Sequence, residues 1–243
     1  MREKTFRDLG LEDNRMKELN EMFDLETLLG ENEPEESKKE ISFLYATGNA
    51  SKVAQVKEYL KAMDIEANIQ SLKDIGFAEE IKEDGKTFEA NSYIKAQAVK
   101  DFCDKKQIET IIIADDAGLC VDALNGAPGV LSARYAGDHA PQNVVLDKLL
   151  KELKGIPDEK RTAQFVCVLT AILPDGKVIS AKGEVKGKIG TTYEVDNKLT
   201  YGPIFIPEGS DRPMAKMTGK ELGKLHREIA LEKLMEQLNL IEK

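Results

Sequence analysis

The chain has 243 residues, of which 41% are hydrophobic and 33% are charged, with a mean hydropathy of −0.39. This composition is typical of a soluble globular protein, and no run approaches the roughly 18 apolar residues of a membrane span. The formal net charge of −9 is concentrated at the amino terminus, because residues 1–40 hold 7 basic and 13 acidic residues. The remainder is nearly balanced in charge, which argues against nucleic acid as a main partner.

The expected location is a reducing cytoplasm, without membrane attachment. The first 14 residues lack the apolar stretch of a signal peptide, and the three cysteines are odd in number and unclustered. With only two histidines and scattered cysteines, the sequence also disfavours a zinc site.

Residues 1–40 are predicted to form a helical extension and an acidic linker, ahead of a domain at 41–243. Apolar residues between 13 and 30 follow the three- and four-residue steps of a one-sided helix. The segment ENEPEESKKE (31–40) is typical of a linker. Two interpretations of the extension stay open: a solvated tail or a helix packed on the body, and a helix that binds a partner or forms a dimer.

From Ile41 onward, strand-like and helix-like segments alternate. Short strands are predicted at 41–46, 65–72 and 110–114, a helix after the Gly-Asn turn, and further helices at about 87–105 and 141–154. Residues 163–173 and 177–190 resemble a long hairpin around Pro174-Asp175-Gly176. Leucines and isoleucines at helical spacing predict a last helix that extends from Ile241 back to Leu222. This order predicts a mixed α/β domain.

The segment ATGNASK (46–52) joins a predicted strand to a predicted helix and has the parts of a phosphate-binding loop. Gly48 permits a tight turn, Thr47 and Asn49 offer side-chain hydrogen bonds, and Lys52 adds a positive charge. The first amides of the helix would be free to receive an anion. Because the Walker spacing is absent, composition alone leaves an ordinary strand–helix turn as the alternative.

Asp115 and Asp116 directly follow the predicted strand at 110–114. Adjacent carboxylates repel each other unless a cation or a proton intervenes, and such pairs are enriched at functional sites. Because neighbouring side chains of a strand point to opposite faces, we expect only one of the two to reach a site directly. Glu83 is a second candidate oxygen ligand for Mg²⁺, and Lys95 a candidate phosphate contact. The alternatives are acidic strand caps and solvated charges.

Several of these segments together resemble the inosine/xanthosine triphosphate pyrophosphatase family over about residues 41–240. ATGNASK is similar to the family's T-G-N-x-x-K, and EDGKTFEANSYIKA to its E-T-G-x-T-F-x-E-N-A-x-x-K-A. ADDAGLCVDALNGAPGVLSARYAG closely follows A-D-D-S-G-L-x-V-D-A-L-x-G-x-P-G-x-x-S-A-R-Y. YGPIF and the His226-Arg227 pair resemble F-G-Y-D-P-I-F and S-H-R.

The resemblance implies Mg²⁺-dependent hydrolysis of a nucleoside triphosphate, such as ITP, dITP or XTP, to the monophosphate and pyrophosphate. It implies an elongated, two-lobed α/β domain with a central mixed sheet flanked by helices, a nucleotide cleft between the lobes, and a homodimer. Position by position, it makes Asp116 the catalytic base and a metal ligand, with Glu83 as the second metal ligand. The implied substrate contacts are Thr47, Gly48, Asn49, Lys52, Lys95, Ala117, Tyr201, His226 and Arg227.

The chain departs from the family pattern mainly where the base is recognised. Family residues that contact the base or flank those contacts are replaced by Leu199, Thr200, Gly202, Glu221, Leu222 and Leu225, and Ala90 and Ala117 replace a glutamate and a serine. Retained phosphate-end residues beside altered base-end residues predict conserved chemistry with drifted or relaxed base specificity. The alternative functions are a non-catalytic nucleotide-binding or assembly module with a partner-binding amino-terminal helix, and a structural scaffold.

Overall fold

The computed structural model describes residues 41–194 and 200–242. The helix predicted at 13–30, the linker at 31–40 and the position of Leu199 lie outside the described residues. The boundary predicted between residues 40 and 41 therefore stays a prediction.

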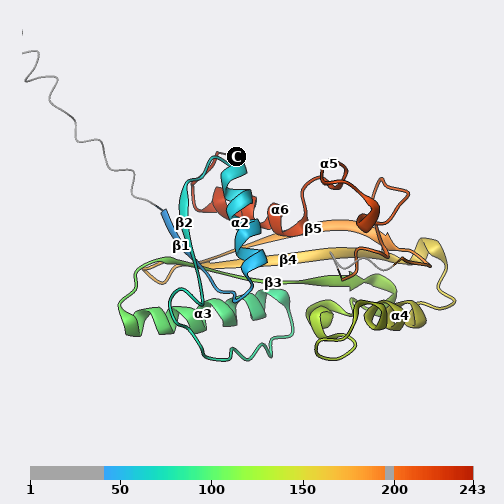
Figure 1. Ribbon diagram of the computed structural model, residues 1–243, viewed down its shortest axis with the longest axis horizontal. Helices are drawn as coiled ribbons and strands as arrows, with labels where there is room; N and C mark the ends of the chain where they lie inside the picture. Colours follow the sequence, from blue (N-terminus) through green and yellow to red (C-terminus); the bar gives the residue numbers. More distant parts are fainter. Residues whose placement is uncertain (1–40, 195–199, 243) are drawn as a thin grey trace, which may run out of the picture. The chain divides into compact units, whose positions relative to one another are not determined.

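A mixed sheet, six-stranded in the described residues, forms the centre of the domain (Figure 1). The strands are β1 (Ile41–Tyr45), β2 (Ala67–Ser71), β3 (Ile111–Val121), β4 (Thr162–Ile172), β5 (Val178–Ile189) and β6 (Phe205–Pro207). Their spatial order is β2-β1-β3-β4-β5-β6. Strand β1 runs parallel to β2 and β3, whereas β3, β4, β5 and β6 pair antiparallel.

Helices cover both faces of this sheet, which confirms the predicted fold class. The α-helices are α2 (Ala50–Ala62), α3 (Phe88–Lys106), α4 (Gln142–Glu152), α5 (Gly219–Leu222) and α6 (His226–Gln237). Short 3-10 helices are η2 (Asp122–Leu124), η3 (Gly129–Arg134), η4 (Asp158–Lys160) and η5 (Met214–Lys216). Helices α2 and α6 lie on one face, and α3 and α4 on the other (Figure 1). Among the described residues, no helix is long and apolar enough to cross a membrane.

Strand β3 is longer than the sequence predicts, and this corrects the placement of the two acids. The predicted strand ends at Ala114, whereas β3 continues to Val121. The parallel pairing with β1 stops at Ile113, but the antiparallel pairing with β4 continues along the strand. Asp115 and Asp116 are therefore interior strand residues that lie just beyond the carboxyl end of β1, not caps at a strand end.

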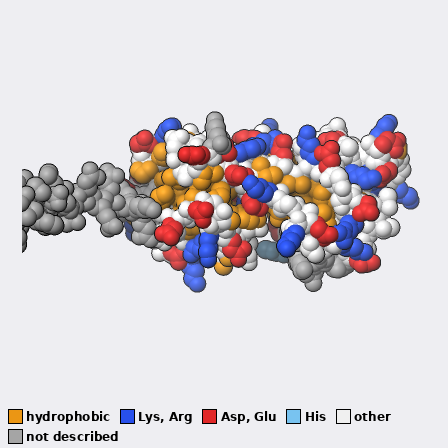
Figure 2. All heavy atoms as spheres, turned by 90° about the horizontal axis from the view of Figure 1, so that it is seen from above, with side chains coloured by type: hydrophobic (Ala, Val, Ile, Leu, Met, Phe, Trp, Pro, Cys, Tyr) orange, Lys and Arg blue, Asp and Glu red, His pale blue; other side chains and the backbone are white. Residues whose placement is uncertain are grey.

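Apolar clusters at the two ends of the long strands account for much of the core. One joins β1, α2 and α6 around Phe43, Leu169 and Leu231. The other joins α4 and β6 to the far end of β3 around Leu119 and Phe205. On the face that α2 and α6 cover, apolar side chains remain visible among acidic and basic ones (Figure 2). The sheet thus connects two separately packed ends, and the paired acids lie between them on β3.

The last helix starts later than the sequence predicts. Helix α5 ends at Leu222, Gly223 adopts a left-handed φ of +59°, and α6 begins at His226. The leucine periodicity therefore bridges two helices, because a glycine at positive φ interrupts the helical hydrogen bonding. The break places His226 and Arg227 in the first turn of α6.

Helix α6 packs directly onto β5 because Gly183 has no side chain. A Cβ atom there would lie 2.0 Å from the His226 carbonyl oxygen and 2.5 Å from the Ala230 nitrogen. Both are backbone atoms, so a larger residue must push the helix away from the strand. The first turn of α6 therefore depends on this glycine.

We predict that Gly183→Ala destabilises the protein by about 1–3 kcal/mol, since the added methyl group overpacks the α6–β5 contact. Gly219→Ala is the matched control, because a Cβ there meets no atom within 4 Å. Urea unfolding followed by circular dichroism measures both. Equal stability of the two variants would contradict the described packing.

Candidate active site

The loop between β1 and α2 is held by its own side chains. Asn49 caps α2: its Oδ1 accepts hydrogen bonds from the amides of Ser51 (2.9 Å) and Lys52 (3.4 Å). Thr47 Oγ1 accepts the Asn49 amide at 3.1 Å, and Gly48 is exposed. Several amides expected to receive an anion are thus engaged by caps, so the charge of Lys52 becomes the principal anion-attracting feature of this loop.

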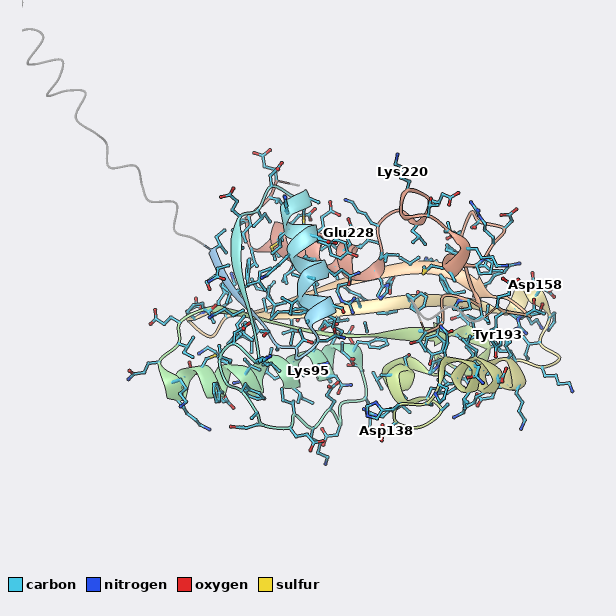
Figure 3. The ribbon with its side chains drawn as sticks, in the orientation of Figure 1. Lys95, Asp138, Asp158, Tyr193, Lys220 and Glu228 are labelled. Carbon is cyan, nitrogen blue, oxygen red and sulfur yellow. The ribbon has the colours of Figure 1, made fainter. Side chains whose placement is uncertain are left out.

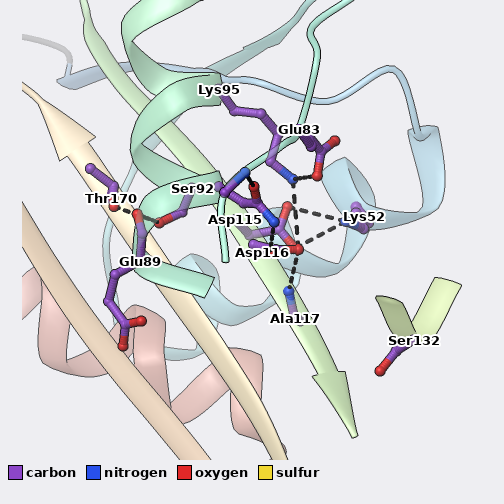
Figure 4. Close-up of polar contacts among 12 residues, drawn as sticks. Lys52, Glu83, Glu89, Ser92, Lys95, Asp115, Asp116, Ala117, Ser132 and Thr170 are labelled. Carbon is purple, nitrogen blue, oxygen red and sulfur yellow. Dashed lines mark hydrogen bonds and ion pairs between the residues drawn. The ribbon is translucent and has the colours of Figure 1, made fainter. Parts of the chain in front are cut away.

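Asp115 gathers two cations on the α2–α6 side of the sheet. Its side chain is 2% exposed, and Lys52 Nζ lies 3.0 Å from Oδ2 and 3.2 Å from Oδ1 (Figure 4). Arg227 Nη2 donates to Oδ2 at 3.1 Å, and its Nη1 donates to Gln55 of α2 at 2.8 Å. Burial alone would raise the pKa of Asp115, but Lys52 and Arg227 outweigh it and hold this pKa well below its usual range.

Asp116 points to the opposite, α3 side of the sheet. Asn91 Nδ2 donates to its Oδ2 at 3.0 Å, and the Ala117 amide donates to its Oδ1 at 3.0 Å. Lys95 Nζ lies 3.1 Å from Glu83 Oε2 and 4.0 Å from Asp116 Oδ1, so one ammonium faces both carboxylates (Figure 4). Burial raises the pKa of Asp116, and Glu83 adds to this, while Lys95 and Asn91 oppose it.

The two acids therefore separate charge across β3. Figure 3 shows Lys95 of α3 and Glu228 of α6 on opposite sides of the sheet. Among the described contacts, Asp115 balances two cations, which leaves a positive excess on the α2–α6 side. On the α3 side, the carboxylates of Glu83 and Asp116 face the one ammonium of Lys95, while Arg134 donates to the Glu83 backbone carbonyl. The first environment suits a phosphate and the second suits a metal ion.

The donor set on the α3 side fits Mg²⁺. Carboxylate oxygens are the ligands that this hard cation prefers, and Mg²⁺ is usually bound by one or two carboxylates together with substrate phosphates. Within the part of the chain that the structure describes, no group of three or more His, Cys, Asp or Glu side chains is arranged to hold a metal. Glu83 and Asp116 thus match a site that the substrate completes rather than an all-protein cage.

His226 and Tyr201 are placed differently from these charged residues. The His226 ring stacks on Phe165 at a centroid distance of 5.2 Å, and its Nδ1 is buried without a hydrogen-bond partner. Tyr201 is buried in the cluster around Phe205, and its hydroxyl donates to the Ser132 carbonyl at 2.8 Å. The structure thus brings Arg227 beside Lys52 at Asp115 but gives the Tyr201 hydroxyl a structural contact.

The residues at the positions expected to lie near the base make contacts within the protein. Glu221 Oε2 accepts hydrogen bonds from the Thr218 amide (2.7 Å) and hydroxyl (2.9 Å) in a capping box, and its other oxygen pairs with Arg212. Leu222 and Leu225 pack against the apolar cluster that contains Phe205. Glu221 is therefore engaged in capping α5, and the neighbouring positions are apolar.

A cavity of about 580 Å³ lies elsewhere, beside β6 and the far ends of β4 and β5. Gln164, Lys186 and Glu208 are among its lining residues, and none of the lining residues is a predicted site residue. The charge and geometry around β3 identify the site better than the size of this cavity does, because charged side chains from several elements converge at Asp115 and Asp116.

Sequence reasoning missed two contributors. Residue patterns alone left open which acid reaches the site, and the family resemblance named only Asp116; the structure makes Asp115 the shared partner of Lys52 and Arg227. Sequence reasoning did not single out Asn91, which contacts Asp116 directly. The period-2 alternation of strand side chains was the available signal for the first. Asn91 matches the asparagine of the family's T-F-x-E-N-A motif, but its contact with Asp116 joins residues 25 positions apart, which the motif does not show.

Comparison with known proteins adds an independent finding. The model of the Ham1 family matches residues 43–237. A protein of Clostridium perfringens named dITP/XTP pyrophosphatase is 42% identical over 203 residues, covering 83% of this chain and 98% of the relative. A Bacillus subtilis protein of the same name is 42% identical over 196 residues, covering 80% of this chain and 96% of the relative.

Solved structures agree with these relatives. The structure of a HAM1 protein from Coxiella burnetii superposes with a TM-score of 0.72 at 32% identity. The match covers 82% of this chain and 99% of that one. The described fold is thus shared with the Coxiella burnetii protein over nearly the whole length of that protein.

The environment of the His226 imidazole, which is half-buried with a buried Nδ1, leads us to predict a stability change with pH. Burial, with a smaller effect of Arg227, lowers the pKa of His226 from 6.5 to about 4. Between these values the unfolded chain binds a proton that the folded chain excludes, so acid favours unfolding. We expect the free energy of unfolding to fall by about 1–3 kcal/mol more in the wild type than in His226→Gln as the pH drops from about 7 to about 4.5.

Urea unfolding at both pH values measures this difference. His139→Gln is the control, because His139 is exposed. It should keep the wild-type dependence, and an identical dependence in His226→Gln would show that the imidazole is not buried in its neutral form.

Proposed function

Because the chain belongs to the Ham1 family, we propose that it hydrolyses non-standard purine nucleoside triphosphates such as dITP, ITP and XTP to the monophosphate and pyrophosphate, with Mg²⁺. The resemblance to the inosine/xanthosine triphosphate pyrophosphatases is confirmed. The chain is a nucleoside triphosphate pyrophosphatase, a hydrolase of phosphoric anhydride bonds. The observation that supports the choice of site is the separation of charge across β3 by Asp115 and Asp116.

The triphosphate would bind on the positive side. Lys52 and Arg227 are both ion-paired to Asp115, and their combined charge exceeds that of its carboxylate. A polyanion placed against them supplies the missing negative charge, and both cations can offset charge that develops on the phosphoryl oxygens. Thr47, Gly48 and Asn49 shape the loop that adjoins this position.

Glu83 and Asp116 would hold Mg²⁺ through their carboxylate oxygens. A bound Mg²⁺ supplies positive charge that neutralises phosphate oxygens and favours departure of pyrophosphate. Lys95, which contacts both carboxylates, is placed to stay close to the same oxygens or to a phosphate.

Asp116 is the proposed base. Its pKa is raised by burial, so its carboxylate binds a proton more readily than an ordinary aspartate does. It would accept a proton from the water that attacks the α-phosphorus. The hydrogen bonds from Asn91 and Ala117 fix the orientation of this carboxylate for that transfer.

Base discrimination is proposed to be weak. Glu221 caps α5, and Leu222 and Leu225 pack in an apolar cluster, so these positions offer no polar contact to a purine edge. A missing polar contact lowers discrimination between bases that differ in their donors and acceptors. The cytoplasmic location and the homodimer stay predictions.

We predict that Asp116→Asn lowers kcat for dITP by at least about 10²-fold, because the amide cannot accept the proton from water. Glu83→Gln should act in the same direction. Asp138→Asn is the matched control, since Asp138 is exposed. The kcat values are measured as pyrophosphate release at saturating Mg²⁺. If Asp116→Asn kept the wild-type kcat, Asp116 would not be the catalytic base.

We also predict a broad substrate range. The measurement is pyrophosphate release from five substrates: dITP, XTP, dGTP, dATP and dUTP. We expect kcat/KM for dITP or XTP to exceed kcat/KM for dGTP or dATP by less than about 10²-fold, which corresponds to about 2.7 kcal/mol of discrimination. A preference of 10⁴-fold would show that another group reads the base. Release from none of the five, by folded protein with Mg²⁺, would contradict the proposed activity.

A further inference from the structure

Asn91 is a buried amide that contacts one proposed metal ligand, Asp116, and the loop that carries the other, Glu83. Its side chain belongs to a residue that is 1% exposed, in the first turn of α3. Its Nδ2 donates to Asp116 Oδ2 at 3.0 Å, and its Oδ1 accepts the Gly85 amide at 2.8 Å. One side chain thus connects strand β3 to the loop that carries Glu83.

The loop that carries Glu83 has no regular secondary structure. Residues 78–85 precede α3 without helical or strand pairing, and Glu83 is partly exposed. Such a segment needs specific contacts to hold one conformation, because ordering each residue costs conformational entropy. The Gly85 amide, two residues after Glu83, is fixed by Asn91, while Lys95 and Arg134 contact Glu83 itself.

The chemistry of the two partners fixes which way the amide points. The Gly85 nitrogen can only donate, so it requires the amide oxygen. With the amide oxygen turned to Gly85, the amide nitrogen faces Asp116 Oδ2 and donates to it. Asparagine satisfies both at once, whereas alanine satisfies neither and aspartate would place a second carboxylate against Asp116.

Gly85 and Ser92 make this arrangement rigid. A Cβ atom at Gly85 would lie 2.6 Å from Asn91 Oδ1 and 2.8 Å from the Ala90 methyl, so only glycine allows the close approach. On the other side, Ser92 Oγ and Thr170 Oγ1 are 2.7 Å apart and tie the first turn of α3 to β4 (Figure 4). Asn91 is therefore held from both directions.

We propose that Asn91 is a positioning residue that assembles Glu83 and Asp116 into one cation site, by holding the loop of Glu83 against the Asp116 carboxylate through Gly85. The inference rests on the proposed function, since it concerns the same two carboxylates. It assigns Asn91 no contact with the substrate or with the metal.

The test measures Mn²⁺ binding to the full chain, without nucleotide, by electron paramagnetic resonance of the free ion. Asn91→Ala should weaken Mn²⁺ binding by about 10–100-fold, the range typical of residues that orient metal ligands. Gly85→Ala should weaken it in the same direction, because the added methyl displaces Asn91 Oδ1. Asn68→Ala, on an exposed position of β2, is the control and should bind Mn²⁺ as the wild type does.

The two substitutions should also be non-additive, because they break the same hydrogen bond from its two ends. The double variant should bind Mn²⁺ about as weakly as whichever single variant has the lower Mn²⁺ affinity. In assays of pyrophosphate release, the two single variants should need more Mg²⁺ than the wild type to reach half-maximal rate. Their KM for dITP at saturating Mg²⁺ should change little. A general loss of structure would not produce this split.

The outcomes separate the inference from the proposed function. Wild-type Mn²⁺ binding in both folded variants would overturn the positioning role and leave the pyrophosphatase proposal intact. Absence of Mn²⁺ binding in the wild type would overturn the metal assignment and this inference with it. Thermal melting establishes that each variant is folded, and if Asn91→Ala fails to fold, Gly85→Ala decides alone.

Discussion

The alternation of side chains along β3 is the constraint on which the rest of the site depends. Successive residues of a strand face opposite sides of the sheet, so two adjacent aspartates cannot occupy one environment. Asp115 meets Lys52 and Arg227 on one side, and Asp116 meets Asn91, Lys95 and the neighbourhood of Glu83 on the other. In the proposed function, this single dipeptide would divide a phosphate-binding region from a metal-binding one. Because the two aspartates are adjacent in one strand, a metal–nucleotide complex would contact both.

The sheet topology makes this placement possible. Strand β1 pairs with β3 only as far as Ile113, and its chain then turns away into the loop that leads to α2. Beyond that point β3 keeps its antiparallel ladder with β4, where Asp115 lies opposite Leu169 and Asp116 opposite Val168. The acids are thus held by one neighbouring strand, while the other edge is open to the loop and to α2. Open α/β sheets commonly bind ligands at such positions beyond the carboxyl ends of parallel strands.

The sequence predicts those elements of the fold that depend on the spacing of residues close together in the chain. Apolar periodicity locates α2, α3, α4, and the β4–β5 hairpin, and the motif around Asp116 indicates the family. Such spacing does not predict the structure where a contact with a residue distant in sequence determines how a segment folds. Strand β3 continues through two acids because β4 pairs with them, and the last helix breaks because Gly223 takes a positive φ despite the leucine spacing around it. Asn91 and Asp115 acquire their roles from partners distant in sequence, so spacing alone does not expose them.

We propose that the metal and the triphosphate are held on opposite sides of strand β3. A crystal structure with Mn²⁺ and α,β-imido-dITP, an analogue with an uncleavable scissile bond, tests it most directly through the anomalous signal of manganese. We expect a manganese peak bound by Glu83 and Asp116, with phosphate oxygens against Lys52 and Arg227. A manganese ion bound by Asp115, or a triphosphate seated away from both cations, would contradict it.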